Sequence, residues 1–388
     1  MTPVHVLTNA AWLTPYGGIE ECTFQDSAAL VSRGNRVDLV YGSDGPQRAD
    51  YEAAGVSVEG SVGFGFNPWR PLRELRTFVA AARLVKKLHP DLLWLNRSEH
   101  IIWARFVAWR AHIPIVCHLH QIPNFRNTRL LYSGVTHFVA VSEFIRQAWI
   151  ARGVAPEKIT VLPNAVPLDR YPFGGPGERT AARDELGLPQ NVPIVLYYGR
   201  ISAQKGVLTL ARAWRELGMA PGEALLVLLG WPSPDSDPEI ARALAALPPG
   251  SYRWFEGRSG IVPFLHAADL TVVPSWAEEA FGRVVIEALA TGRPVIASEI
   301  GGIPEVLSGD MSRFLVPPRD PQALAAGIRS LLNWRLDDPH LGEACRAMVE
   351  EKYPYDVHID RLEEVLRRYK RRPPSTVRAR NCRSSPNR

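Results

Sequence analysis

Two glutamates lie on either side of the predicted start of a helix in the second half of the sequence. Glu279 comes just before Gly282, where the helix opens, and Glu287 lies a turn or more inside it. A helix N-terminus presents free backbone N–H groups and about half a positive charge, which suits a phosphate. One acid can meet a hydroxyl-rich group ahead of the helix, and the other can reach back along its side. This layout fits a ligand with a sugar at one end and a ribose at the other, joined by phosphates.

Two cations follow the apolar run 193–198, which predicts a buried strand. Arg200 and Lys205 therefore emerge at the carboxyl end of that strand, where they can neutralise a diphosphate. Each charge-assisted hydrogen bond there is worth roughly 1.5–3 kcal/mol. The alternative is a pair of solvated surface cations. The segment is not a Walker P-loop, because it lacks Gly-x4-Gly-Lys-Ser/Thr. We expect neither a metal nor a cofactor at this site.

The elements that position these groups alternate between strands and helices. The run 270–273 reads as a strand that stops at Pro274, and the helix after Gly282 stops at Gly292. The first half begins in the same way, with a strand at 4–7, a loop containing Gly17 and Gly18, a helix, and a strand at 37–40. This order predicts parallel, doubly wound sheets of the α/β class.

Length and composition indicate two such domains. A chain of 388 residues is too long for one ordinary core. The Pro- and Gly-rich stretch 167–177 marks the linker. We expect a first domain over 1–168 and a second over 169–354. A final helix is expected over 355–370, and 371–388 is expected to be a disordered basic tail.

Charge and cysteine usage exclude several classes of protein. Six arginines lie in the last eighteen residues, and removing them from the net charge of +5 leaves −1 for the rest. The high pI therefore belongs to the tail and does not indicate a nucleic-acid groove. The four cysteines form no CxxC pair, which favours free thiols in a reducing cytosol. No secretory signal and no apolar run of about 20 residues is apparent, so we expect a cytoplasmic protein.

A basic amphipathic helix is predicted over 71–88. Leu72, Leu75, Phe78, Val79, Ala82, Val85 and Leu88 share one face, and arginines and lysines lie elsewhere on its surface. We expect the apolar face to pack in the core. The other reading is contact with the inner face of a membrane, since such helices also bind anionic lipid.

His120 ends another apolar run, 114–119, at the edge where open α/β sheets bind ligands. A single histidine at a strand end is often structural. The residues alone therefore leave both a structural role and a ligand-binding role open for His120. Asn96, Arg97 and Ser98 reach the same edge after the strand 92–95. Ser142 is placed to cap the helix that follows the strand 139–141.

Several of these segments resemble glycosyltransferase family 4, and the resemblance covers about residues 3–370. The segment 279–282 resembles the family's Glu-Pro-Phe-Gly core, and Glu279 and Glu287 have its Glu-x7-Glu spacing. Gly-Arg…Lys-Gly over 199–206 and Gly-Gly-x-Pro-Glu over 301–305 also match. There are departures: Ala165 replaces a glycine, Gln121 follows the histidine, and Gly-Trp-Pro replaces Gly-x-Gly-Pro at 230–232.

The resemblance implies a GT-B fold, with two Rossmann-like domains facing a central cleft, and a retaining enzyme that uses a nucleotide sugar. It also implies that the final helix, 355–370, packs back on the first domain. UDP-sugars are the commoner donors of the family, and GDP-mannose is the main alternative. The catalytic residues it implies are His120, Arg200, Lys205 and Glu279. The donor-binding residues are Gly17, Gly18, Arg200, Lys205, Arg258, Glu279, Ala280, Phe281, Gly282, Arg283, Val284 and Glu287.

We therefore predict transfer of a hexose-type sugar to the hydroxyl of a glycan, a lipid-linked sugar or a small metabolite. The alternatives are a GT-B sugar-nucleotide epimerase or phosphorylase, a non-catalytic nucleotide-sugar-binding protein, and a protein organised on a membrane surface by its basic segments. Neither the loop 61–70 nor the loop 121–133 carries a recognisable acceptor signature.

Overall fold

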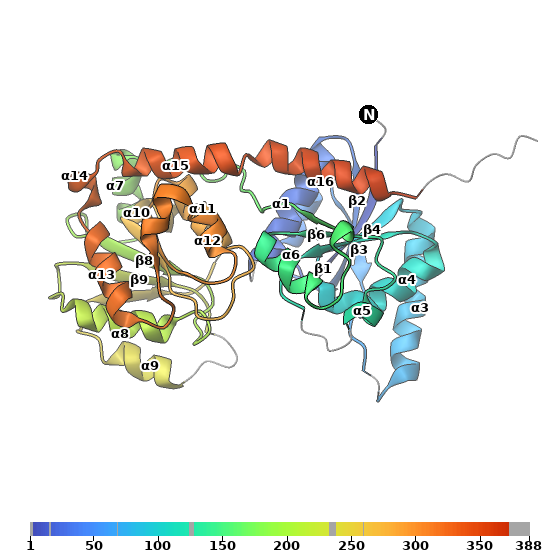
Figure 1. The fold of residues 1–388 in the computed structure, drawn as a ribbon, viewed down its shortest axis with the longest axis horizontal. Coiled ribbons are helices and arrows are strands. Elements are labelled where there is room, and N and C mark those ends of the chain that lie inside the picture. The colour runs from blue at the N-terminus through green and yellow to red at the C-terminus, as the bar shows by residue number, and fades with distance from the viewer. Residues whose placement is uncertain are drawn as a thin grey trace, which may run out of the picture.

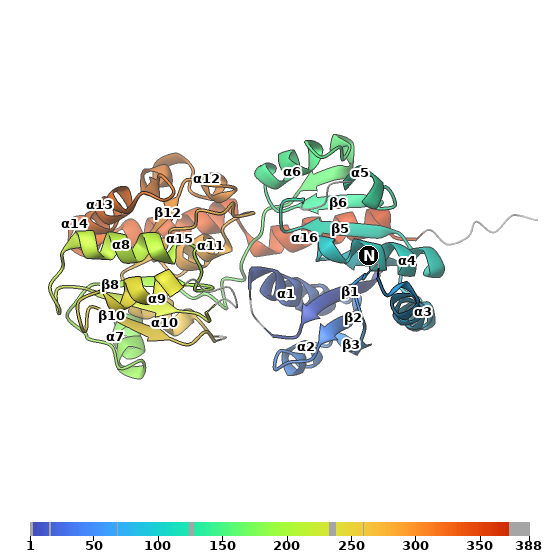
Figure 2. The same cartoon turned by 90° about the horizontal axis from the view of Figure 1, so that it is seen from below.

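The protein has two α/β domains, each built on a parallel sheet (Figures 1 and 2). The structure is a computed structural model. It describes residues 3–371 except 15–16, 68, 124–127, 233–237 and 259. The GT-B arrangement predicted from the sequence is confirmed. Most of the basic tail predicted to be disordered, 372–388, lies outside the described residues.

The first sheet has seven strands in the order β3-β2-β1-β4-β5-β6-β7, and every neighbouring pair is parallel. The chain order reverses between β1 and β4, which is where open sheets of this kind form their ligand crevice. The strands are β1 (His5–Trp12), β2 (Arg36–Ser43), β3 (Ser57–Ser61), β4 (Leu92–Leu95), β5 (Ile115–Leu119), β6 (His137–Ala140) and β7 (Ile159–Val161).

The second sheet has six strands in the order β10-β9-β8-β11-β12-β13, again all parallel. Here the chain order reverses between β8 and β11, so the loops that follow these two strands lie next to each other. The strands are β8 (Ile194–Tyr198), β9 (Leu225–Leu229), β10 (Tyr252–Phe255), β11 (Leu270–Val273), β12 (Val295–Ser298) and β13 (Leu315–Val316).

Helices cover both faces of each sheet (Figure 2), which is why the central strands are buried along almost their whole length. In the first domain they are α1 (Gly18–Ser32), α2 (Arg48–Ala53), α3 (Pro71–Leu88), α4 (Ile101–Ala111), α5 (Thr128–Leu131) and α6 (Glu143–Ile150). The later helices are α7 (Pro176–Glu185), α8 (Val207–Leu217), α9 (Pro238–Ala245), α10 (Val262–Ala267), α11 (Arg283–Ala290), α12 (Ile303–Val306), α13 (Pro321–Leu331), α14 (Trp334–Asp337), α15 (Leu341–Lys352) and α16 (Tyr355–Tyr369). Short 3-10 turns occur at Ser98–His100, Pro156–Lys158 and Gly309–Phe314.

The last helix crosses back to the first domain. In Figure 1, α15 and α16 run in succession along one side of both domains. Ile359, Leu362 and Leu366 of α16 join the buried apolar cluster of β1, β2 and α1. His358 Nδ1 lies 2.8 Å from the carbonyl oxygen of Pro163, and its Nε2 lies 3.3 Å from Asp26. The helix therefore ties the second half of the chain to the first domain.

Helix α3 has the predicted bounds, but the prediction that its whole apolar face is buried is wrong. Phe78 and Val85 are buried, whereas Leu72 is 74% exposed and Leu75 is 47% exposed. The neighbouring helix explains the difference. Helix α3 has 18 residues and α4 has only 11, so at 1.5 Å per residue α3 is longer by about 10 Å. Its first turns extend past the end of α4 (Figure 1), and Leu72 and Leu75 stay exposed there.

Candidate active site

The loop after β8 carries both predicted cations and is held tightly against the loop after β11. A Cβ atom on Gly206 would lie 1.7 Å from the carbonyl oxygen of Pro274, so only glycine fits there. The carbonyl oxygen of Gln204 accepts hydrogen bonds from the backbone N–H groups of Trp276 and Ala277, at 3.1 and 3.2 Å. The two loops that follow neighbouring strands therefore form one surface.

Lys205 and Glu279, which were each predicted to be catalytic, are in contact. The Lys205 Nζ lies 2.6 Å from Oε1 of Glu279, and the Ser275 hydroxyl donates to the same oxygen at 2.6 Å. Burial alone would raise the pKa of the Glu279 carboxyl, but the charge and hydrogen bond of Lys205 hold that pKa below its ordinary value. Glu279 is therefore ionised at neutral pH, and its Oε2 accepts no hydrogen bond from any described residue.

Arg200 differs from Lys205 because its guanidinium is exposed and forms no ion pair with any described residue. Its charge nevertheless contributes to the lowered pKa of Glu279, which places the two side chains within electrostatic range. An unpaired cation beside a paired one leaves net positive charge at the carboxyl end of β8. That is the charge a diphosphate requires.

The start of α11 is fixed by three glycines. Gly282 caps the helix with a φ of +93°, a conformation that favours glycine. Gly301 and Gly302 press against the backbone of 279–280, where added Cβ atoms would lie 2.2 and 2.5 Å from backbone oxygens. The Gly302 N–H also donates to the carbonyl oxygen of Glu279 at 2.8 Å. Segment 279–282 is thus held in place directly before the helix N-terminus.

Glu287 lies inside a buried polar cluster. Its Oε1 accepts from Arg283 Nε at 2.6 Å and from the Tyr171 hydroxyl at 3.1 Å, and the Tyr198 hydroxyl lies 2.8 Å from Oε2. Tyr198 also lies 3.1 Å from the carbonyl oxygen of Val284. The sequence reasoning missed both tyrosines, because Tyr198 lies in an ordinary apolar run and Tyr171 in the Pro- and Gly-rich linker.

Arg283 joins the two domains. Its guanidinium donates to Gln25 Oε1 at 2.6 Å and to the Cys22 sulfur at 3.0 Å, and both partners belong to α1. Gly18, at the start of α1, faces the same side chain, since a Cβ there would lie 3.6 Å from Arg283 Cδ. Gly17 caps α1 in an extended conformation. The predicted glycines of the first domain are therefore brought to the helix α11 that carries Glu287.

Contacts between α6 and the second domain hold the two halves of the site together. Ser142 caps α6, as predicted, by accepting from the N–H of Ile145 at 3.1 Å, and its hydroxyl donates to the carbonyl oxygen of Ala280 at 2.6 Å. The Glu305 carboxylate accepts from the N–H groups of Glu143 and Phe144, at 2.9 and 2.7 Å.

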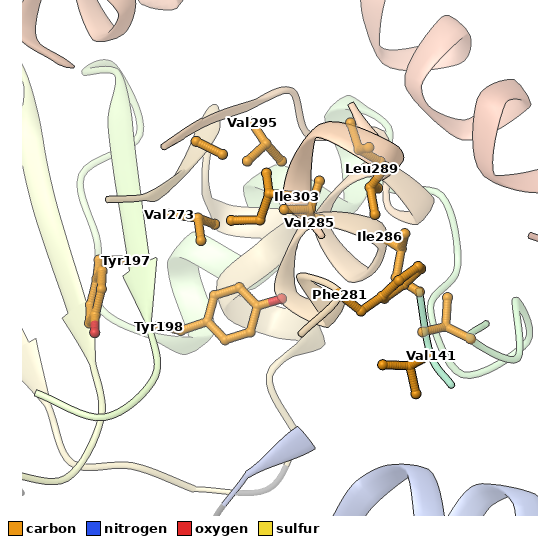
Figure 3. Packing of buried hydrophobic residues seen from close by; sticks show 14 of the residues in the cluster. Val141, Tyr197, Tyr198, Val273, Phe281, Val285, Ile286, Leu289, Val295 and Ile303 are labelled. Carbon is orange, nitrogen blue, oxygen red and sulfur yellow. The ribbon is translucent and has the colours of Figure 1, made fainter. Parts of the chain in front are cut away.

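An apolar contact accompanies these hydrogen bonds. Figure 3 shows Phe281 on the side of the second domain that faces Val141 of the first, and both residues belong to one buried cluster. Because Phe281 directly follows Ala280, the segment before α11 is anchored to the first domain by packing as well as by Ser142.

His120 lies directly after β5, as predicted, and its Nε2 lies 3.3 Å from Asn96 Oδ1. Burial, followed by the charge of Arg97, lowers the pKa of His120 to about 3. The imidazole is therefore neutral at physiological pH. A neutral imidazole can position a hydroxyl group by hydrogen bonding without adding charge to the site.

A second polar network lies at the same edge of the first sheet. Arg97 forms ion pairs with Glu20 and with Glu99, the latter at 2.9 Å, and Gln121 donates to Glu99 at 2.9 Å. His100 Nδ1 lies 3.0 Å from the amide nitrogen of Asn9. The sequence had singled out Arg97 by its place after β4, and Gln121 only as a departure from the family pattern. The ion-pair partners of Arg97 are Glu20 of α1 and Glu99 of a 3-10 turn, and no local sequence pattern connects these segments.

Arg258, which was predicted to bind the donor, is not joined to this site by the described contacts. Arg258 is exposed, and its guanidinium lies 5.5 Å from the centre of the Phe264 ring. The sequence also contains an Asp-Ser-Asp triplet at 235–237, which the expectation of a metal-independent site overlooked. The triplet lies outside the described residues. Within the described part, no three acidic, histidine or cysteine side chains form a metal-binding group.

The buried histidines predict how stability depends on pH. Burial lowers the pKa of His100 to about 4 and that of His120 to about 3. Between pH 6.5 and 4 the unfolded chain therefore binds protons that the folded chain does not, so the free energy of unfolding falls as the pH is lowered. The slope is up to about 1.4 kcal/mol per pH unit for each histidine. Urea unfolding at pH 7, 6 and 5 measures it, and His120→Asn should reduce it. An unchanged slope in that variant would contradict the assignment.

Known proteins match both halves of the chain. Residues 16–170 match the family described as Glycosyltransferase Family 4, and residues 178–353 match Glycosyl transferases group 1. A D-inositol 3-phosphate glycosyltransferase of Geodermatophilus obscurus is 37% identical over 363 residues, which cover 81% of this chain and 78% of that protein. The enzyme of the same name from Nocardia farcinica is 32% identical, and the match covers 62% of this chain and 58% of that protein.

A solved structure has the same fold. Anabaena Alr3699/HepE, in complex with UDP and glucose, superposes with a TM-score of 0.82 at 22% identity, and the match covers 94% of this chain and 99% of that one. The fold and the matches together define a GT-B glycosyltransferase. Within that class, the chain belongs to glycosyltransferase family 4. The predicted family and the predicted enzyme class are both confirmed.

Proposed function

We propose that this glycosyltransferase is a retaining enzyme that moves a hexose-type sugar from a UDP-sugar to an acceptor hydroxyl. The observation that carries the proposal is the joined surface of the β8 and β11 loops. It brings Arg200 and the Lys205–Glu279 pair together with the segment that leads into α11. One end of this surface suits a diphosphate and the other suits hydroxyl groups. The UDP and glucose bound in Anabaena Alr3699/HepE support a UDP-sugar as donor.

Each residue of the site has a role in this proposal. Arg200 and Lys205 stabilise the negative charge that builds on the leaving diphosphate, since preorganised charge is usually the largest catalytic term. The free Oε2 of Glu279 accepts hydrogen bonds from sugar hydroxyls. Glu287 accepts from the ribose. Its Oε2 has one close hydroxyl partner, and a carboxylate oxygen can accept two hydrogen bonds.

The proposed reaction is front-face attack. The bond between the anomeric carbon and the diphosphate oxygen breaks, and the acceptor oxygen bonds to that carbon from the same side. The acceptor proton passes to the departing phosphate oxygen. His120, which is neutral, orients the acceptor hydroxyl or the sugar. Proton NMR of the product gives its anomeric configuration, and inversion would refute retention. A trapped glycosyl-enzyme adduct would replace front-face attack by a covalent intermediate.

The acceptor in this proposal is a hydroxyl-rich molecule held by the first domain. The network of Asn9, Asn96, His100, His120 and Gln121 offers amides and neutral rings at the carboxyl edge of the first sheet. Such groups donate to and accept from hydroxyls. The inositol-phosphate enzymes among the relatives support a polyol or a sugar. A glycan and a lipid-linked sugar share this chemistry.

Measuring the release of free UDP distinguishes a sugar-transfer enzyme from a phosphorylase and from a non-catalytic binding protein. We expect the enzyme to release UDP in proportion to glycoside formed, whereas a phosphorylase would require inorganic phosphate and a binding protein would release none. The rate should persist in excess EDTA, because Arg200 and Lys205 supply the positive charge that a metal would otherwise bring. A rate that is lost in EDTA and restored by Mg²⁺ or Mn²⁺ would show that a metal takes part, and it would direct attention to the Asp-Ser-Asp triplet at 235–237.

A further inference from the structure

An apolar patch projects from the first domain, at the start of α3. Phe66 and Trp69, from the preceding loop, are 46% and 90% exposed, and Leu72 and Leu75 of the helix are 74% and 47% exposed. Figure 1 shows this end of α3 extending beyond the rest of the first domain. We name these four residues, together with Arg70, Arg73 and Arg76, the α3 tip. Exposed apolar side chains that cluster in this way mark a surface for another molecule.

The chemistry of the α3 tip indicates an anionic partner. Arg70, Arg73 and Arg76 are exposed, and none forms an ion pair with a described residue. The first turn of α3 contains one acid, Glu74. The tip therefore carries a net positive charge around a tryptophan, a phenylalanine and two leucines. A second copy of the chain would bring like charges together in a symmetric contact, which is unfavourable.

A helix with apolar residues at one side, arginines beside them and an exposed tryptophan has the composition of segments that lie in the interface of a membrane. No described helix is long and apolar enough to cross a membrane, so the contact would be peripheral. We propose that the α3 tip docks on an anionic lipid surface. Trp69 and Leu72 enter the interface, and the three arginines contact lipid phosphates. This docking is independent of which donor or acceptor the enzyme uses.

Vesicle co-sedimentation tests the proposal. The full chain should bind vesicles that contain phosphatidylglycerol more strongly than vesicles of phosphatidylcholine alone, and rising salt should weaken that binding. The variant Trp69→Ser/Leu72→Ser/Leu75→Ser should lower the partition coefficient by about tenfold or more, because apolar burial contributes to interfacial binding. The matched control is Leu336→Ser, on α14 of the second domain, where an 82% exposed leucine is replaced in the same way. It should bind as the wild type does.

These variants distinguish lipid binding by the α3 tip from lipid binding by the basic tail. All variants keep residues 371–388, so attraction of the tail to anionic lipid is common to them. Equal binding of the triple variant and the wild type would assign any binding to the tail and overturn the proposal. Absence of wild-type binding to anionic vesicles would also overturn it, as would dimerisation through the tip without lipid binding. Thermal unfolding and UDP release should be the same in all three proteins, since the replaced side chains are exposed.

Discussion

Replacing Lys205 by alanine is expected to lower the rate of sugar transfer by roughly 10²–10³-fold, the usual cost of losing one preorganised group that stabilises developing charge. The lysine lies 2.6 Å from Glu279, on a loop fixed by the contact of Gly206 with Pro274. The charge on the leaving diphosphate grows as the glycosidic bond breaks. The loss should therefore appear in kcat more than in the KM for the donor.

Loss of the lysine also leaves Glu279 without its cation, and this second effect must be separated from the first. The double variant Lys205→Ala/Glu279→Gln removes both charges, so no buried carboxylate is left uncompensated. If Lys205 acts on the diphosphate, the double variant stays as slow as Lys205→Ala. Recovery of the rate in the double variant would show that the lysine serves only to balance Glu279.

Arg200→Ala is the companion variant, and Arg212→Ala is the matched control. Arg212 lies on α8, which is the helix that follows the same loop. It forms an exposed ion pair with Glu239. Its removal should change the rate less than twofold, since exposed pairs contribute little. Rates of UDP release, measured at saturating donor, compare the three proteins. Similar rates in Lys205→Ala and Arg212→Ala would remove the physical basis of the proposed function.

The backbone of this site could be predicted because its signals are local. Strands β8 and β11 are short apolar runs, and each stops at a residue that strands or helices rarely tolerate, Gly199 or Pro274. The parallel order then places the loops after both strands at one edge, as observed. Helix α11 begins at Arg283, directly after the glycine that predicted its start.

The partners of the charged groups could not be predicted, because they come from distant segments. Glu287 meets Tyr171 from a position 116 residues away, and Arg283 meets Gln25 across 258 residues. No periodicity connects such positions. Likewise, the exposure of Leu72 depends on the length of α4 and not on the pattern of α3 itself. Sequence patterns predict which face is apolar, and neighbouring elements decide whether that face is covered.

Replacing Glu287 by alanine should destabilise the protein by about 3–5 kcal/mol, because it leaves Arg283 buried without its counter-charge. Both side chains are almost fully buried, at 7% and 8% exposure. The control is Glu350→Ala, which removes an Arg–Glu pair of the same spacing, with Arg346, on α15. There the glutamate is 51% exposed, so the expected cost is below about 1 kcal/mol. Urea unfolding of the three proteins measures the difference.

The ribose role of Glu287 requires a measurement that a purely structural role would leave unchanged. The variant Glu287→Gln keeps the shape of the side chain and can still accept from Arg283. If Glu287 binds the ribose hydroxyls, the wild type should prefer UDP over 2′-deoxy-UDP, and the glutamine variant should lose much of that preference, since a hydrogen bond to a charged group is worth roughly 1.5–3 kcal/mol. Calorimetry measures the binding of UDP and of 2′-deoxy-UDP to the wild type and to Glu287→Gln. The four affinities give the coupling energy between the Glu287 side chain and the ribose 2′-hydroxyl. An equal preference in the two proteins would show that Glu287 does not bind the ribose. Its role would then be to position Arg283, which contacts α1.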